Sequence, residues 1–363
     1  MVFDDHRNHF YAKAIEQAVN SGSVVLDLGA GLGIHGFMAA RQGASRVYMV
    51  EPASILDITL QLIDANQLSD RVKCIRGKIE EIALPEKVDT IISVFTGNFL
   101  LTEDLLPSLF HARDKYLKPG GKLIPDRAAM EVVPVSAPDY YAEHIDCWLS
   151  DSSGIDFGIV RNFAANSLYH DTPSDRDAEF LANPAQLLEL DFMTATKASC
   201  RNNTEVVATR DGLCHGWLGW FRQRLGETWL STSPQEKQTH WRQVFLPLAE
   251  PLSIIRGDCL SFELNRPEFG EWTWTSTHNG KKQRHSTFLS SPVSSKSMQQ
   301  LSDAYEPGLT EKGEAARDVL THMNGDITTE KIANQLVTCY AELFHNQQQA
   351  VRFVKDLIAR YGK

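Results

Sequence analysis

At 363 residues, 42% of them apolar and 23% charged, the chain has room for two or three globular domains with a full-sized core. The formal net charge is −10 and no block of Lys or Arg occurs, which argues against nucleic acid as the main partner. The N-terminus lacks an apolar signal core, no run approaches ~18 apolar residues, and the six cysteines form no Cys-x-x-Cys pair. We therefore expect a cytoplasmic protein with reduced thiols, no membrane partner and no metal site.

Residues 3–19 predict one or two helices ahead of the first strand. Asp4, Arg7 and Tyr11 are spaced i, i+3 and i+7, so a helix would place all three on one face. The same spacing is typical of a solvated helix with a local ion pair, so both interpretations are open at this point.

Residues 24–51 predict a buried strand, a glycine turn, a helix and a second strand that ends in Glu51. The turn has the pattern Asp-x-Gly-x-Gly-x-Gly, formed by Asp27, Gly29, Gly31 and Gly33. Glycines let the backbone approach a ligand closely, and the start of a helix presents free N–H groups to it. The carboxylate of Glu51 lies where it could hold both hydroxyls of a ribose.

Three ligand assignments are open for this turn. Gly31, Gly33 and Gly36 also form the pattern Gly-x-Gly-x-x-Gly, so a dinucleotide must be considered. Asp27 before the first glycine favours S-adenosylmethionine, whose methionine part carries an amine and a carboxylate but no pyrophosphate. An empty structural turn is the third interpretation.

Alternating strands and helices continue to about residue 127. The expected elements are a helix at 54–66, strands at 72–76 and 88–93, a helix at 105–116 and a strand at 122–124. This alternation predicts an α/β doubly wound sheet for residues 1–127, with its ligand at the carboxyl ends of the strands. Arg7, Asp27, Glu51, Glu80 and the loop after Ser93 should converge there.

The pattern changes near Pro125. Residues 128–292 contain short runs of strand-forming residues interspersed with aromatic residues, and the hairpin signal Asn279-Gly280. These features predict a β-barrel domain. We expect a helical insert at about 140–185. Residues 305–363 carry apolar residues at helical spacing and predict a small all-helical C-terminal domain.

Ordered blocks of the sequence resemble protein arginine methyltransferases. They are Asp4-x-x-Arg7-x-x-x-Tyr11, residues 25–33, 47–51, 77–81, 93–103, 112–121 and 125–127, and Thr239-His240-Trp241. The resemblance covers roughly residues 1–290. It implies a class I methyltransferase that uses S-adenosylmethionine, and a homodimer whose arm would be the helical insert.

By position, the resemblance also assigns roles to single residues. The cofactor-binding residues would be Arg7, Asp27, Gly29, Gly31, Gly33, Glu51 and Glu80. Within this set Arg7 would hold the methionine carboxylate, Glu51 the ribose, and Glu80 would lie at the adenine.

The acceptor loop of residues 93–103 departs from the family pattern, in which two glutamates flank the substrate guanidinium. Glu103 keeps the second glutamate, whereas Val94 stands in place of the first. The neighbouring methionine and tyrosine of the family are Thr96 and Asn98 here. Losing a charge-assisted partner costs about 1.5–3 kcal/mol per bond, so either arginine lies differently or the acceptor needs one carboxylate.

Glu103 and His240 are therefore the catalytic candidates, as general base or orienting group. We expect Val94, Thr96, Asn98 and Trp241 at the substrate. His240 is equally compatible with a structural role, and Thr96 and Asn98 with ordinary loop positions.

Three functions remain open. The first is transfer of a methyl group from S-adenosylmethionine to a nitrogen or oxygen nucleophile of a peptide or small-molecule acceptor. The second is a catalytically degenerate S-adenosylmethionine-binding protein that recognises a peptide, which Val94 motivates. The third is a nicotinamide-dependent reductase.

The tail carries a second, shorter resemblance. Residues 309–315 and 323–336 look like the helical part of PqqD-like domains, which hold precursor peptides for modification. This resemblance spans about 50 residues and implies a peptide substrate. The alternative is a small helical cap that packs on the barrel.

Overall fold

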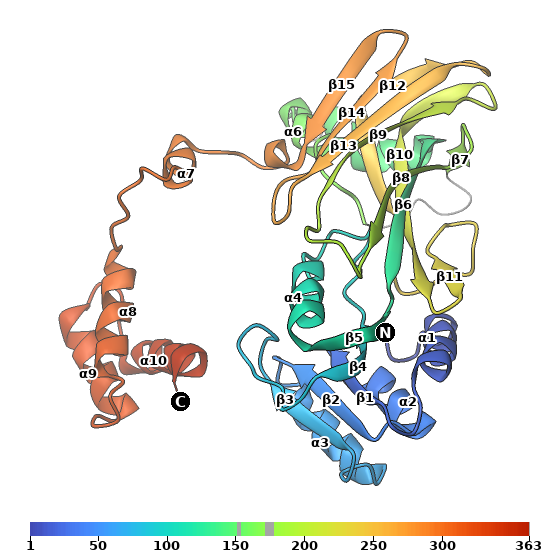
Figure 1. The fold of residues 1–363 in the computed structure, drawn as a ribbon. Coiled ribbons are helices and arrows are strands. Elements are labelled where there is room, and N and C mark those ends of the chain that lie inside the picture. Colours follow the sequence, from blue (N-terminus) through green and yellow to red (C-terminus); the bar gives the residue numbers. More distant parts are fainter. Residues whose placement is uncertain (151–153, 171–177, 363) are drawn as a thin grey trace. The chain divides into compact units, whose positions relative to one another are not determined.

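The computed structural model describes residues 1–150, 154–170 and 178–362. The chain divides into two compact units, Met1–Pro292 and Val293–Lys363. Figure 1 shows the first unit as a parallel sheet with helices below a set of antiparallel strands.

The N-terminal part of the first unit is a five-stranded parallel sheet in the order β3-β2-β1-β4-β5. Its elements are α1 (Asp5–Ala18), β1 (Val24–Leu28), α2 (Ile34–Gln42), β2 (Arg46–Glu51), α3 (Leu56–Ala65), β3 (Val72–Arg76), β4 (Val88–Ser93), α4 (Leu106–Tyr116) and β5 (Leu117–Ile124). All five residues of β1 are buried, as its continuous apolar run predicts for a central parallel strand. The sequence thus predicted the order of helices and strands in this sheet.

The second part of the unit consists of two antiparallel sheets, which together form a barrel-like domain. One sheet contains β6 (Arg127–Ser136), β7 (Glu179–Phe180), β8 (Ala185–Asp191), β10 (Gly212–Leu225), β11 (Thr228–Ser231) and β12 (Val244–Ile254). The other contains β9 (Cys200–Val207), β13 (Cys259–Arg266), β14 (Thr273–His278) and β15 (Lys281–Ser286). Trp217 of β10 packs on Phe262 of β13 with ring centroids 4.6 Å apart, which joins the two sheets through the core.

The expected turn between β14 and β15 is present. Asn279 and Gly280 have φ values of 47° and 78°, the left-handed pair that a two-residue hairpin requires. An Asn-Gly pair adopts this backbone at little cost, which is why it predicts the hairpin from sequence alone.

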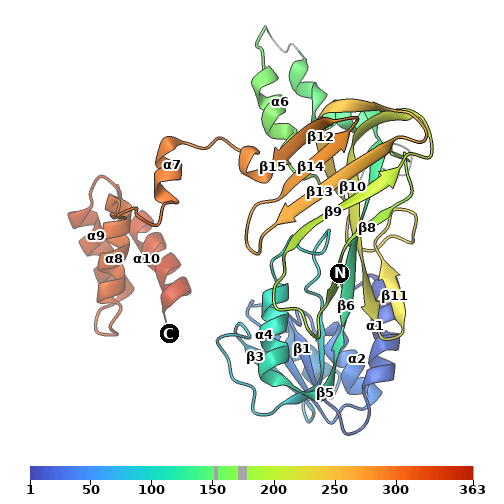
Figure 2. The same cartoon turned by 45° about the horizontal axis from the view of Figure 1, so that its top comes forward.

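The helical insert is shorter than the sequence predicted. Its helical elements are α5 (Pro138–His144), the short 3-10 helix η1 (Asp146–Leu149) and α6 (Gly158–Ala164). Figure 2 shows α6 beyond the antiparallel sheets. Residues 179–180 fall inside the range predicted for the helical insert, but they form strand β7, which pairs with β6. Residues 151–153 and 171–177, which also fall in the predicted insert, lie outside the described residues.

Polar contacts join the two parts of the first unit. Arg113 of α4 is 8% exposed and donates to the carbonyl oxygens of Phe192 and Ala195 at 2.6 and 2.7 Å. Asp126 accepts from Nε and Nη2 of Arg224 at 2.8 and 2.5 Å. These contacts fix the barrel-like domain relative to the sheet.

The second unit is a three-helix bundle after the short helix α7 (Ser295–Gln300). Its helices are α8 (Glu311–His322), α9 (Thr329–Cys339) and α10 (Gln347–Tyr361). Each begins at a side chain that accepts an N–H of its first turn, namely Thr310, Thr328 and Asn346. The bundle has its own apolar core, which includes Val319, Leu336 and Val354. The predicted helical domain is thus present, whereas its likeness to peptide-holding domains stays a prediction.

None of the helices in the described part of the chain has the length and apolar composition needed to cross a membrane.

Because the apolar core of the bundle shares no residue with the cores of the first unit, we expect the two units to unfold independently. A chain that ends at Pro292 should keep the thermal transition of the first unit, measured by calorimetry. In the full chain, Val354→Asp should abolish only the transition of the bundle, because it buries a charge in that core. A shift of the first transition in either variant would contradict independent folding.

Candidate active site

The turn between β1 and α2 has a backbone that favours glycine at three positions. Gly29, Gly31 and Gly33 have φ values of 70°, 54° and 79°. A Cβ at Gly29 would lie 2.4 Å from the ring of Phe95, and one at Gly33 would lie 2.8 Å from Met49 Sδ. The turn is therefore closely surrounded, and a side chain at Gly29 or Gly33 would displace its neighbours.

Asp27 holds this turn to the first residues of α2. Its side chain is 3% exposed, and Oδ2 accepts the N–H of Gly36 at 2.7 Å. Burial raises the pKa of Asp27 to about 7; the Gly36 hydrogen bond opposes that rise and the negative charge of Glu51 adds to it. The buried Asp27 thus stabilises the turn by a hydrogen bond to the backbone of α2.

Glu51 ends β2 beside the same turn. Its Oε2 accepts the N–H of Gly31 at 3.0 Å and its Oε1 accepts the N–H of Ala53 at 2.9 Å. A carboxylate has about four lone-pair directions, so two remain for the hydroxyls of a ribose. This geometry fits the role that the sequence predicted for Glu51.

A cavity of about 500 Å³ opens next to the turn at the carboxyl edge of the sheet. Its lining includes Gly29, residues 77–81, Phe95, Asp104, Leu105, Pro107 and Ser108. Glu80 Oε1 accepts the hydroxyl of Ser108 at 2.5 Å, which positions this carboxylate at the cavity. The volume is within the range of small-molecule sites. The residues present therefore fit a nucleoside with a ribose near Glu51 and a base near Glu80.

Arg7 is buried rather than solvated. Its side chain is 2% exposed, and Nη2 donates to the carbonyl of Met1 and to Asn8 Oδ1, both at 2.9 Å. The guanidinium lies 5.8 Å from the ring centroid of Trp241. Burial lowers the pKa of Arg7, and its charge contributes to the low pKa of the buried His35, about 3, for which burial is the main cause.

Asp4 joins α1 to the loop that contains His240. As the N-cap of α1, its Oδ1 accepts the N–H of Arg7 at 3.0 Å. Its Oδ2 lies 2.8 Å from both the backbone nitrogen and Nδ1 of His240. Burial by itself would raise the pKa of Asp4, but these hydrogen bonds hold it below its ordinary value. The structure thus brings the N-terminus of α1, with Asp4 and Arg7, against the loop of His240.

Burial lowers the pKa of His240, although Asp4 opposes the change. A neutral imidazole that donates its Nδ1 proton to Asp4 leaves Nε2 as an acceptor. His240 is therefore held in the tautomer that a general base requires. Trp241, by contrast, is 4% exposed and packs on Phe221, so it supports the loop, and its expected contact with an acceptor stays a prediction.

The acceptor loop between β4 and α4 is attached to the barrel-like domain at its start. Thr96 is 1% exposed, and its hydroxyl lies 2.9 Å from Gln223 Oε1 of β10. Gln223 Nε2 lies 3.4 Å from the hydroxyl of Tyr11, which donates to the carbonyl of Ser93 at 2.9 Å. The hydroxyl of Thr96 is thus engaged inside the protein, and its expected contact with an acceptor stays a prediction.

Phe99 attaches the middle of the loop to the same domain. Its ring is fully buried and stacks on Trp272 with centroids 5.6 Å apart. A Cβ at Gly219 of β10 would lie 2.5 Å from this ring. Asn98 Oδ1 accepts the N–H of Arg242 at 2.9 Å, which connects the acceptor loop to the loop of His240.

The two residues at the family's glutamate positions have different surroundings. Val94 packs partly buried against the apolar core of the first unit. Glu103 is exposed to solvent, yet partial desolvation of its carboxyl raises its pKa. In the part of the chain that the structure describes, no hydrogen bond or ion pair engages the Glu103 carboxylate, so it is available to a cationic or N–H-bearing acceptor.

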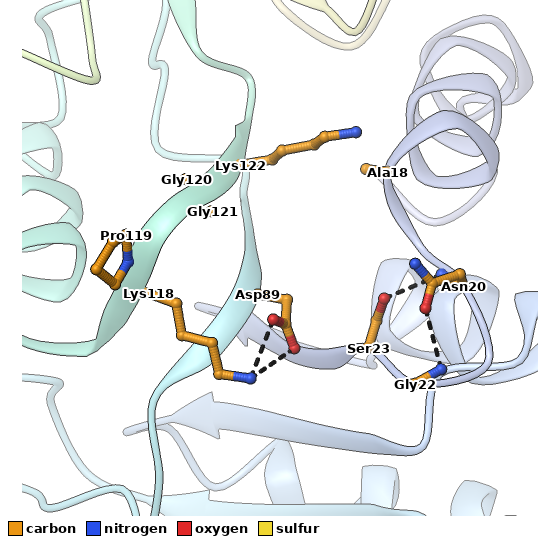
Figure 3. Close-up of a pocket in the computed structure, with 10 residues that line it drawn as sticks. All are labelled: Ala18, Asn20, Gly22, Ser23, Asp89, Lys118, Pro119, Gly120, Gly121 and Lys122. Atoms are coloured by element: carbon orange, nitrogen blue, oxygen red, sulfur yellow. Dashed lines mark hydrogen bonds and ion pairs between the residues drawn. The ribbon is translucent and has the colours of Figure 1, made fainter.

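A second hollow of about 450 Å³ lies at the opposite edge of the sheet. Ser23, just before β1, and Asp89, near the start of β4, contribute to it, and Lys118 lies 2.9 and 3.0 Å from the two oxygens of Asp89 (Figure 3). Ligands of parallel sheets bind at the carboxyl edge, so this hollow is separate from the candidate active site.

No sequence pattern indicated Gln223, Arg266 and Phe269, which all lie near the loop. Gln223 is a fully buried polar residue within a strand, and its distant partners Thr96 and Tyr11 explain it. Among the described residues, no group of three or more His, Cys, Asp or Glu could hold a metal ion.

The comparisons with known proteins agree with this geometry. Residues 25–121 match the family model of a methyltransferase domain, and residues 126–269 match that of the arginine methyltransferase oligomerization subdomain. The chain is 37% identical over 267 residues to protein arginine N-methyltransferase 1 of Schizosaccharomyces pombe, covering 71% of this chain and 78% of the relative. It is 33% identical over 282 residues to the Dictyostelium discoideum protein of the same name, covering 73% and 82%.

Solved structures show the same fold. A chain of the Trypanosoma brucei protein arginine methyltransferase 1 enzyme–prozyme heterotetrameric complex with AdoHcy is 28% identical, with a TM-score of 0.72 over 79% of this chain and 96% of that one. Arabidopsis thaliana protein arginine methyltransferase 10, in an open conformation, is 26% identical, with a TM-score of 0.68 over the same shares.

The pKa of Asp27 leads to a prediction about stability. The folded state keeps a proton up to about pH 7, whereas the unfolded state, with a pKa near 4, releases it earlier. The contribution of Asp27 to the free energy of unfolding should therefore fall as pH rises from about 4 to about 7, by up to about 4 kcal/mol. Asp27→Asn keeps the oxygen that accepts the Gly36 N–H but has no proton to lose between pH ~4 and pH ~7. Its free energy of unfolding, measured with urea, should therefore rise relative to that of the wild type as the pH increases over this range.

Asp89 is a matched control, because its pKa is shifted in the opposite direction to that of Asp27. Although burial opposes it, the N–H of Val24 and the ammonium of Lys118 hold the pKa of Asp89 below its usual value. Asp89→Asn should therefore lose stability relative to the wild type as pH rises through the acid range. Equal pH profiles for Asp27→Asn and the wild type would contradict the raised pKa.

Proposed function

The chain belongs to the protein arginine N-methyltransferase family and is an S-adenosylmethionine-dependent methyltransferase, and we propose that its acceptor is the guanidinium of an arginine in a peptide. The observation that carries the proposal is the carboxylate of Glu103, which is accessible to solvent and has no hydrogen-bond or ion-pair partner among the described residues. One carboxylate matches the charge of one guanidinium and can accept two of its N–H groups.

The cofactor cavity supports this assignment. Glu51 and the glycine turn would hold the ribose, Glu80 the adenine, and the buried cation of Arg7 the methionine carboxylate. When bound, S-adenosylmethionine supplies a methyl group on a positively charged sulfur. The residues of the chain then have to orient the acceptor nitrogen and take its proton.

Glu103 and His240 divide these two tasks in the proposed mechanism. Glu103 orients the guanidinium and draws its positive charge toward one side, which leaves the nitrogen on the other side better able to attack. The nitrogen forms its bond to the methyl carbon as the carbon–sulfur bond breaks, and the nitrogen then releases a proton. His240 Nε2, kept as an acceptor by Asp4, receives that proton directly or through a water.

Val94 lowers the expected affinity for arginine. An N–H group directed at its apolar side chain stays unpaired, which costs about 1–3 kcal/mol. This cost favours a second candidate function, a partner protein that binds the cofactor without turnover. The solved structure from Trypanosoma brucei is an enzyme–prozyme complex. A chain with this fold can therefore also serve as a non-catalytic subunit of a mixed assembly.

The insert supports an oligomer. Leu149, Ile155 and Ile159 are 62%, 54% and 72% exposed, so the helical arm presents apolar side chains without partners in the described chain. This region lies in the segment that matches the oligomerization subdomain. We propose a homodimer in which the arm buries this surface against a second copy.

Methyl transfer can be tested with S-adenosylmethionine labelled in its methyl group. Purified full-length chain should label arginine in a mixture of arginine-containing peptides, and Glu103→Gln should lower turnover by about 100-fold or more while cofactor affinity, measured by calorimetry, persists. Unchanged turnover in Glu103→Gln would remove Glu103 from the site. Label on small molecules only would overturn the peptide acceptor.

Val94→Glu provides the matched gain-of-function variant. If Val94 weakens guanidinium binding, the added carboxylate should lower KM for the arginine peptide roughly tenfold to a hundredfold. Cofactor binding without turnover in either the wild type or Val94→Glu would favour the non-catalytic partner protein.

The dimer leads to a separate prediction. Ile159→Glu places a charge in the proposed interface and should convert the dimer into a monomer in light-scattering measurements of molar mass. Val207→Glu is a control, because Val207 is 61% exposed on β9, outside the arm. A wild-type chain that is monomeric at micromolar concentration would refute the homodimer.

A further inference from the structure

One wall of the cofactor cavity comes from the barrel-like domain. Phe269 lies between β13 and β14, and every other described residue that lines this cavity lies within residues 28–108. The ring of Phe269 belongs to a residue that is 69% exposed, although large aromatic side chains are usually buried. An exposed ring that lines a cavity is available to a ligand in that cavity.

The backbone of Phe269 is held in an uncommon conformation. Its φ is 56°, in the left-handed region that is unfavourable for a bulky residue. Its N–H donates to Asp104 Oδ1 at 3.1 Å, and Asp104 itself has a φ of 54°. Strained backbone of this kind persists where the surroundings enforce it, and it is concentrated at ligand sites.

An ion pair between the buried Arg266 and Asp104 lies beside this backbone. Arg266 Nη2 lies 2.5 Å from Asp104 Oδ2, and the Arg266 side chain is 2% exposed. The Arg266 guanidinium lies 5.5 Å from the ring centroid of Trp272, the ring on which Phe99 of the acceptor loop stacks. Phe269 is thus fixed to Asp104, the residue that directly follows Glu103.

The chemistry of the cavity indicates what Phe269 would contact. Its wall contains the apolar side chains of Phe95, Leu105 and Pro107 in addition to Phe269, with the carboxylate of Glu80 at one side. Adenine is the only flat aromatic group of the cofactor, and its amino group can donate to a carboxylate. Aromatic side chains bind the faces of bases by stacking.

We propose that Phe269 is a cofactor-binding residue that stacks on or against the adenine, so that the barrel-like domain completes the nucleoside site. The proposal rests on the assignment of this cavity to S-adenosylmethionine. Because Asp104 holds Phe269 and adjoins Glu103, the same contact ties cofactor binding to the end of the acceptor loop. The barrel-like domain would then contact the cofactor through Phe269 and position the acceptor loop through Asp104.

The test is calorimetric titration of the full-length chain with S-adenosylhomocysteine. Phe269→Ala should weaken binding by about tenfold, the amount typical of one base stacked on an aromatic side chain. Phe269→Gly should weaken it similarly, because glycine adopts the left-handed backbone without strain and the variant loses only the ring. Phe269→Tyr should restore most of the affinity, and KM for S-adenosylmethionine should follow these changes with little effect on kcat.

Phe288→Ala is the matched control, since Phe288 is an exposed phenylalanine of the same domain that does not line the cavity. It should bind as the wild type does, and all variants should keep the wild-type melting temperature without ligand. If the wild type binds and both Phe269→Ala and Phe269→Gly bind within about twofold of it, the proposal is overturned. If the wild type does not bind, the cofactor assignment fails and the proposal fails with it.

Discussion

The attachment of the acceptor loop to the barrel-like domain is the constraint on which the rest of this site depends. The loop leaves the parallel sheet after β4, yet Thr96, Phe99 and Asp104 are all held by residues of the barrel-like domain. These anchors are a hydrogen bond, an aromatic stack and an ion pair, and they bracket Glu103 from both sides. The position of the Glu103 carboxylate is thus decided by the barrel-like domain, although its loop leaves the parallel sheet.

Carboxylates govern the electrostatics of the site, in keeping with a cofactor and an acceptor that both carry positive charge. Asp27, Glu51 and Glu80 each accept an N–H or O–H group from the protein, which fixes their orientation before a ligand arrives. Glu103 differs because no group of the described chain engages its solvent-accessible carboxylate, which the proposed function assigns to the acceptor. Val94 removes the second negative charge that the family pattern places nearby, so the acceptor has one charged partner instead of two.

The elements outside the site have apolar surfaces and cores of their own. The helical arm exposes Leu149 and Ile159. Contact with a second copy of the chain would remove this apolar surface from water, which is favourable. The three-helix bundle needs no such partner, since Ala315, Val319 and Leu336 are already buried within it. The arm is therefore expected to act through assembly, and the bundle as a separately folded unit.

The sequence by itself determined the parallel sheet, the glycine turn, the Asn279-Gly280 hairpin and the helices of the bundle. These features depend on periodicity, on left-handed backbone at glycine, and on caps, all of which act between near neighbours. Only the tertiary structure decided the partners of the acceptor loop, the end of the helical insert and the cavity wall at Phe269. Thr96 and Gln223 are 127 residues apart, and Asp104 and Arg266 are 162 apart. Pairs this distant leave no local pattern, because folding alone brings their side chains together.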